Sequence, residues 1–142
     1  MSMEKELLNT FDKELLLKDL CARLPYGVKV NGVFLTYDKD KDKILYKECV
    51  KELNYSHLSR YWTLKPYLFP LSNMTDEQKE SSPFESSLLN AFINGHISLF
   101  EDEELNIDDL NRLYDWLNKN HFDYRNLIDK NLAIDCTNLN IY

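Results

Sequence analysis

The stretch from Asn111 to Asp135 constrains the fold more than any other part of the chain. Aromatic, apolar and charged residues alternate here at helical spacing, break at Asn120-His121 and then resume. Apolar residues that recur at three- and four-residue steps place one face of a helix against a core. The pattern therefore predicts that the chain ends in two packed helices joined by a turn.

The first 24 residues carry another helical pattern, formed by leucines and a phenylalanine at three- and four-residue steps. Pro25 follows directly, and the residue before a proline is pushed out of the helical conformation. The sequence therefore predicts an N-terminal helix that ends at Leu24.

Residues 25–65 show short apolar runs that are typical of strands. The pair Asn31-Gly32 is the strongest short-range signal for a hairpin turn, and the alternating Asp and Lys residues of 38–43 read as a second, polar turn. We expect strands on both sides of Asn31-Gly32, another over 44–50 and a fourth over 57–64. Together they predict a small antiparallel sheet or a partly closed barrel.

Residues 66–142 are expected to hold an irregular crossing segment followed by helices. Prolines 66, 70 and 83 bracket the crossing segment, Thr75 begins the pattern of a capped helix, and Asn106 can cap a later one. A chain of 142 residues with 44% hydrophobic content is long enough to bury a core without disulfides or metal. We predict a single α+β domain.

Charge is distributed unevenly along this chain, whose net charge is −7. Residues 1–65 hold 12 Lys and Arg against 10 Asp and Glu, whereas residues 66–142 hold 5 against 14. Binding to a phosphate backbone needs clustered positive charge. Direct nucleic-acid binding is therefore disfavoured, and the acidic half predicts a protein partner with a basic surface.

The sequence also bears on the compartment. No apolar run approaches the ~20 residues that span a bilayer, and the N-terminus lacks the basic and apolar regions of a secretion signal. The three cysteines (Cys21, Cys49 and Cys136) are odd in number and have no Cys-x-x-Cys spacing, which is typical of reduced thiols. We expect a cytoplasmic protein that does not contact membranes.

Motifs for catalysis, cofactors and metals are weak. Asp38, Asp40 and Asp42 resemble the start of a calcium loop, but Lys43 and Cys49 stand where that loop needs glycine and glutamate. The three histidines lie far apart, and no phosphate-binding glycine motif or nucleophile elbow is present. The sequence predicts no catalytic residue, no cofactor and no metal site.

One candidate interaction surface is an acidic run formed by Glu101, Asp102, Glu103 and Glu104. Such a run would attract a basic partner, and imitation of a nucleic acid is the extreme form of this hypothesis. The simpler interpretation is a solvated link into a helix N-terminus, where the helix dipole favours acids.

A second candidate is the cluster Asp123, Tyr124 and Arg125, because tyrosine and arginine are enriched at interface hot spots. The structural alternative is that Asp123 caps a helix beginning at Tyr124, while Arg125 pairs with a carboxylate such as Asp129.

Three blocks of the chain resemble a group of small hypothetical proteins from phages and prophages of anaerobic gut bacteria. The blocks are residues 14–30, residues 65–75 and residues 115–134, which make up 48 of the 142 residues. Residues 38–60 and 76–106 lie outside them.

This resemblance implies a setting rather than a reaction. A small intracellular protein carried by a phage is expected to be an accessory factor that binds a protein in the host cell cytoplasm, such as a defence or regulatory component. The alternatives are an enzyme of unknown reaction, or a protein that sequesters a small molecule or nucleotide. Non-enzymatic binding is the favoured hypothesis.

Overall fold

The computed structural model describes residues 8–84, 86–94 and 107–142. Helix α1 (Thr10–Arg23) confirms the predicted N-terminal helix. The Asn9 side chain caps its start by accepting a hydrogen bond from the Asp12 N–H. A 3-10 turn, η2 (Leu24–Tyr26), follows and contains Pro25. The helix therefore ends where the proline predicted.

Strands β1 (Lys29–Asp38) and β2 (Lys43–Glu52) form an antiparallel hairpin. The expected turn at Asn31-Gly32 is wrong, because β1 runs through this pair and the chain turns at residues 39–42 instead. Gly32 is required for space: a Cβ at this position would lie 2.6 Å from Cδ2 of Leu64.

The expected strand over 57–64 is also wrong, since this segment lies in a 3-10 helix, η3 (Tyr55–Thr63). Its start is fixed by local side-chain bonds: the Asn54 side chain accepts from the Ser56 N–H, and Nδ1 of His57 accepts from the Asn54 N–H. These caps satisfy backbone groups locally, which favours a helical turn over a strand.

Strand β3 (Lys65–Pro70) lies in the segment that was expected to be irregular. It pairs antiparallel with β1, and parallel with two short strands, β4 (Phe122–Asp123) and β5 (Ile134–Asp135). Proline has no N–H to donate to a sheet, and its presence therefore argues against a strand. For this reason the sequence did not indicate β3. The result is an open mixed sheet of five strands rather than a closed barrel.

The described residues of the C-terminal half form three α-helices, which confirms its predicted helical character. A short 3-10 turn, η4 (Leu71–Asn73), leads into α2 (Asp76–Ser81), whose capping box pairs Thr75 with Gln78 as the sequence predicted. Helices α3 (Ser86–Ile93) and α4 (Ile107–Lys119) follow.

The predicted break at Asn120-His121 is confirmed, but the second helix beyond it is wrong. His121, Asn126 and Asn131 have φ values of 64°, 62° and 60°. Left-handed residues of this kind interrupt a right-handed helix. The chain after α4 is instead a series of turns that supplies β4 and β5 to the sheet.

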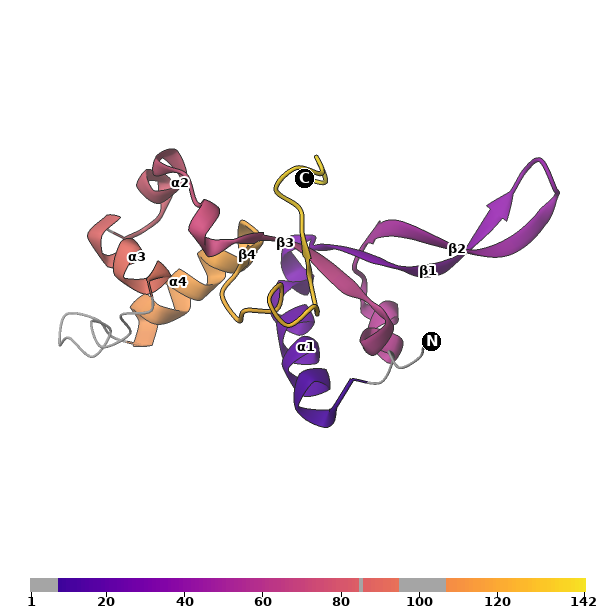
Figure 1. The fold of residues 1–142 in the computed structure, drawn as a ribbon, viewed down its shortest axis with the longest axis horizontal. Helices are drawn as coiled ribbons and strands as arrows, with labels where there is room; N and C mark the ends of the chain where they lie inside the picture. Colours follow the sequence, from indigo (N-terminus) through magenta and orange to yellow (C-terminus); the bar gives the residue numbers. More distant parts are fainter. Residues whose placement is uncertain (1–7, 85, 95–106) are drawn as a thin grey trace.

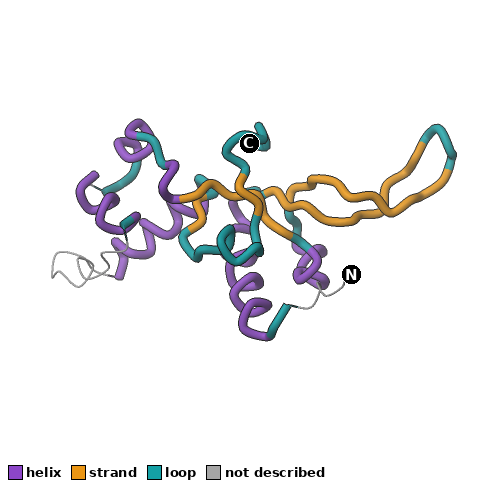
Figure 2. Tube along the Cα trace, in the orientation of Figure 1, coloured by secondary structure: helices purple, strands orange, loops and turns teal. Residues whose placement is uncertain are grey.

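Two clusters of buried side chains hold these elements together. The first contains Leu20 of α1, Val30 of β1 and Leu68 of β3. The second contains Leu117 of α4 and Phe122 of β4. As Figure 2 shows, the β1–β2 hairpin extends from one side of the molecule, and α2, α3 and α4 lie at the opposite end.

Candidate functional site

The β1–β2 hairpin is a two-stranded ribbon over most of its length. β3 pairs with β1 only at Val30 and Asn31, near the base of the hairpin. Beyond that point the ribbon projects from the body of the molecule (Figure 1). A two-stranded ribbon is at best marginally stable in water, so contacts on its faces determine whether it stays ordered.

One face of this ribbon is apolar and exposed. Side chains alternate between the two faces of a strand, and the pairing places Leu35 opposite Tyr46 and Tyr37 opposite Ile44. Six apolar side chains on this face are 41–74% exposed: Val33, Leu35, Tyr37, Ile44, Tyr46 and Val50. We call these six residues the hairpin face. Single exposed apolar residues are ordinary, whereas a contiguous set marks an interaction site.

The opposite face of the ribbon is anchored at its base by Phe34, which is buried. The Arg60 guanidinium lies 4.8 Å and Nζ of Lys51 5.5 Å from the centre of the Phe34 ring. His57 packs on the same ring at 5.0 Å. Burial, followed by the charges of Arg60 and Lys51, lowers the pKa of His57. This face is therefore packed and cationic at its base, in contrast to the hairpin face.

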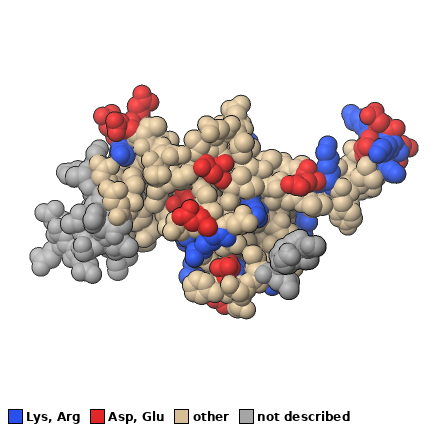
Figure 3. All heavy atoms as spheres, viewed as in Figure 1, with Lys and Arg blue, Asp and Glu red and all other residues tan. Residues whose placement is uncertain are grey.

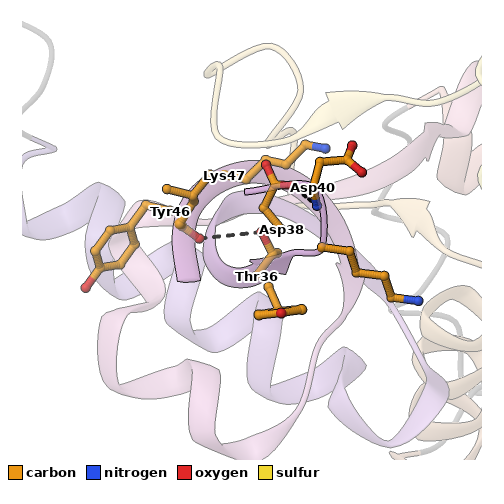
Figure 4. Close-up of a pocket in the computed structure, with 8 residues that line it drawn as sticks. Thr36, Asp38, Asp40, Tyr46 and Lys47 are labelled. Atoms are coloured by element: carbon orange, nitrogen blue, oxygen red, sulfur yellow. Dashed lines mark hydrogen bonds between the residues drawn. The ribbon is translucent and has the colours of Figure 1, made fainter. Parts of the chain in front are cut away.

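The aspartates at the tip of the hairpin support the turn. Oδ1 of Asp38 accepts hydrogen bonds from the N–H groups of Asp40 and Lys41, at 2.9 and 3.2 Å, and Asp42 accepts one from the Tyr37 hydroxyl. An open hollow of about 400 Å³ lies beside them, lined by both strands (Figure 4). Within the described parts of the chain, no group of three His, Cys, Asp or Glu residues is arranged to hold a metal ion.

A buried ionic network joins α1 to the C-terminal turns. Nε of Arg23 donates to Oδ2 of Asp19, and Nη1 of Arg125 donates to Oδ1 of the same carboxylate, both at 2.8 Å. Nη2 of Arg23 also donates to the Phe122 carbonyl at 2.6 Å. Asp19 and Arg23 are fully buried. Sequence reasoning missed this pair, although an Asp and an Arg four residues apart among buried leucines is a readable signal.

The candidate residues Asp123, Tyr124 and Arg125 take part in internal contacts. Asp123 is 7% exposed, and its carboxylate accepts the N–H groups of Leu127 and Ile128. It therefore supports turns rather than the expected helix. The Tyr124 hydroxyl donates to Asn118 at 2.8 Å, and Arg125 pairs with Asp19 instead of Asp129. These contacts favour the structural interpretation of the cluster.

The other candidate, the acidic run Glu101, Asp102, Glu103 and Glu104, lies outside the described residues. Just after it, Asp108 is exposed and Asp109 forms an ion pair with Arg112 at the start of α4. Figure 3 shows a further group of acidic side chains over α2, at its upper left. Acidic groups therefore occur at the end of the molecule away from the hairpin.

The rings of His121 and Tyr142 stack with their centres 3.7 Å apart. The Tyr142 hydroxyl donates to the Tyr67 carbonyl and accepts from the Lys29 N–H, each at 2.8 Å. Burial, with smaller effects of Arg23 and Lys29, lowers the pKa of His121 to about 4. The His121 ring is therefore neutral near pH 7. The two hydrogen bonds of the Tyr142 hydroxyl hold Tyr142 against β1 and β3.

The thiol of Cys136 is buried in the core. Burial and the neighbouring Asp135 raise the pKa of Cys136 to about 11. A nucleophilic thiol must instead be deprotonated near neutral pH and accessible to a substrate. Cys136 is therefore a packed side chain of the core.

The hairpin face was not among the residues singled out from the sequence. Its signal is the alternation of Val33, Leu35 and Tyr37 before the Asp-Lys turn and of Ile44 and Tyr46 after it. The turn predicted at Asn31-Gly32 concealed this alternation, because it divided β1 into two separate short strands.

Comparisons of the chain with protein-family models, with curated proteins and with solved structures find no match. Over its described residues, no helix has both the length and the apolar character needed to cross a membrane.

Proposed function

We propose that this chain is a non-enzymatic binding protein that acts through protein–protein contact. The observation that carries this proposal is the hairpin face, an exposed apolar surface on a projecting ribbon. A contiguous set of exposed apolar side chains favours the burial of another protein surface. In the setting implied by the sequence resemblance, the protein is a small accessory factor carried by a phage or prophage, with host defence or regulatory components among its targets.

An enzyme or a protein that sequesters a small molecule is less well supported. Such sites are usually concave, with a few polar groups converging on an enclosed ligand. The hollow at the hairpin tip is open, and a second hollow of about 350 Å³ is lined by residues from α1 alone, from Phe11 to Lys18. The first hollow is lined by the β1–β2 hairpin alone.

The acidic C-terminal half provides a second surface for the target, at the end of the molecule away from the hairpin. Residues 66–142 hold 14 acidic and 5 basic residues, and acidic surfaces speed association with basic ones. We propose that the target presents a basic surface to this half, with the run Glu101–Glu104 as part of the contact.

The test uses a photo-crosslinking amino acid, p-benzoylphenylalanine, placed at position 46 in living cells that produce the full chain. Tyr46 is 74% exposed on the hairpin face, so the aromatic replacement should leave the fold intact. We expect a covalent adduct with protein from position 46. The matched control is the same residue at position 47, which points to the opposite face. Absence of any protein adduct from position 46 would contradict the proposed function.

A further inference from the structure

We propose that the hairpin face binds the hairpin face of a second copy of this chain, forming a homodimer through two ribbons packed face to face. This inference rests on the proposed function, because it names the protein that covers the exposed surface. It leaves the acidic half of each copy available for a different partner.

The size of the surface fits a stable dimer. The exposed fractions of the six side chains correspond to roughly 700 Å² on each copy, close to the ~800 Å² per partner in an interface of standard size. Crystal-type contacts are generally smaller and poorly packed. The hairpin face is therefore large enough to hold two copies together without help from another element.

The composition of the surface fits a partner identical to itself. A two-fold symmetric interface brings the same patch from both subunits together, so the patch must be complementary to itself. On this face of the two strands the charged residues are Lys29 and Glu52 at the base and Glu48, which lies opposite Val33 and accepts a hydrogen bond from the Asn31 side chain. The pairs Leu35–Tyr46 and Tyr37–Ile44, nearer the tip than Glu48, carry no charge and can meet their copies without opposing like charges.

The distribution of charge also favours contact at this end of the molecule. The whole chain carries −7, but residues 29–52 hold six Lys against five Asp and Glu. Two copies therefore repel each other mainly through their acidic halves. The ribbon projects away from the acidic side chains over α2 (Figure 3), so contact through the hairpin face keeps those groups of the two copies apart. A strongly acidic or basic partner would find no complementary charge on the hairpin face.

Pairing would also explain how an isolated ribbon is stabilised. Two ribbons that stack at the ~10 Å spacing of packed sheets form a two-layered structure with a shared apolar interior. Each ribbon then gains the second layer that a two-stranded hairpin lacks.

The experiment measures the mass of the full chain in solution by sedimentation velocity and light scattering. At roughly 100 µM chain, above the micromolar dissociation constants of weak standard-size interfaces, we expect twice the chain mass of 16.9 kDa. Leu35→Glu and Tyr46→Glu place a charge at the centre of the interface and should yield monomers. The matched control, Lys47→Gln, also lowers the net charge by one but lies on the opposite face, and it should remain dimeric.

Circular dichroism checks that each variant keeps the wild-type spectrum, which is expected because Leu35 and Tyr46 are exposed. The melting temperature of the wild-type chain provides a readout that needs no variant, since a dimer becomes more stable as its concentration rises. A monomeric wild-type chain at this concentration, or a dimer that persists in both glutamate variants, would overturn the proposal.

The crosslinking experiment distinguishes the homodimer from the proposed binding function. An adduct between two copies of this chain from position 46 supports the homodimer. An adduct only with other proteins supports the binding function and overturns the homodimer. No adduct at all contradicts both.

Discussion

At the scale of single residues, the buried carboxylate of Asp19 forms ion pairs with two arginines. It pairs with Arg23, which is fully buried, and with Arg125, whose side chain is 18% exposed. Removing one partner of a buried ion pair leaves an uncompensated charge in a medium that solvates it poorly. Asp19 should therefore contribute to stability far more than an exposed acid of the same helix.

We predict that Asp19→Ala destabilises the fold by about 3–5 kcal/mol, because two guanidinium groups lose their shared carboxylate. Urea denaturation followed by circular dichroism measures the change in the free energy of unfolding. The control is Glu14→Ala, an exposed position of α1, which should change stability by less than about 0.5 kcal/mol. Equal effects of the two substitutions would mean that the network is hydrated and weak.

His121 predicts a dependence of stability on pH. Its pKa is about 4 in the folded state against the usual 6.5, so the unfolded chain takes up a proton first as the pH falls. Stability is therefore fully present above pH 6.5 and is lost between 6.5 and about 4, by on the order of 2–3 kcal/mol. Thermal unfolding across this range measures the loss.

The matched variant is His121→Asn, because asparagine tolerates the left-handed backbone of this position. His57 also has a lowered pKa, so the difference between wild type and variant isolates His121. An identical pH profile in the two proteins would show that the ring is free to take up a proton in the folded state.

At the scale of elements, the sequence correctly predicted the helices whose ends are determined by local interactions. The caps at Asn9 and Thr75 are formed within one helical turn, and so α1 and α2 could be placed correctly. β3 depends instead on partners more than fifty residues away, and the Asp19–Arg125 ion pair joins residues 106 positions apart. Such contacts leave no periodic pattern, which is why β3 and the ionic network were missed.

Gly32 offers a test of the corrected hairpin. We predict that Gly32→Ala destabilises the fold by about 1–3 kcal/mol, the usual effect of overpacking, because the new methyl group meets the buried Leu64 side chain. Chemical denaturation measures the loss. In a Leu64→Val background the added methyl finds room, so its cost should fall. A cost that stays the same in both backgrounds would point to backbone strain at Gly32 instead.

At the scale of the whole molecule, an apolar ribbon and an acidic group of helices lie at opposite ends. The two ends should respond differently to salt. Screening acts over about 8–10 Å at physiological ionic strength and weakens attraction between exposed charges. Apolar contact is insensitive to this screening, and the repulsion between two chains of charge −7 decreases.

We therefore predict that added sodium chloride weakens binding of a short poly-lysine peptide but leaves the fraction of dimer unchanged or raises it. Fluorescence anisotropy measures the first and sedimentation velocity the second. Neutral amides at Glu101, Asp102, Glu103 and Glu104 should weaken peptide binding without changing the dimer. Peptide binding that is flat with salt and unaffected by the amides would leave the acidic run with a role in solubility alone.

The parallel pairing of β3 with β4 and β5 has a consequence for synthesis on the ribosome. The hairpin can form as soon as β2 has emerged, but β3 must wait for strands that end at Asp123 and Asp135. At ~5–20 residues per second, the delay from β3 to β5 is roughly 3–13 s. During this time β3 can pair only with β1, at Lys65 and Pro66, and the rest of this largely apolar strand lacks its partners. Newly made molecules are then most open to capture by chaperones or by one another.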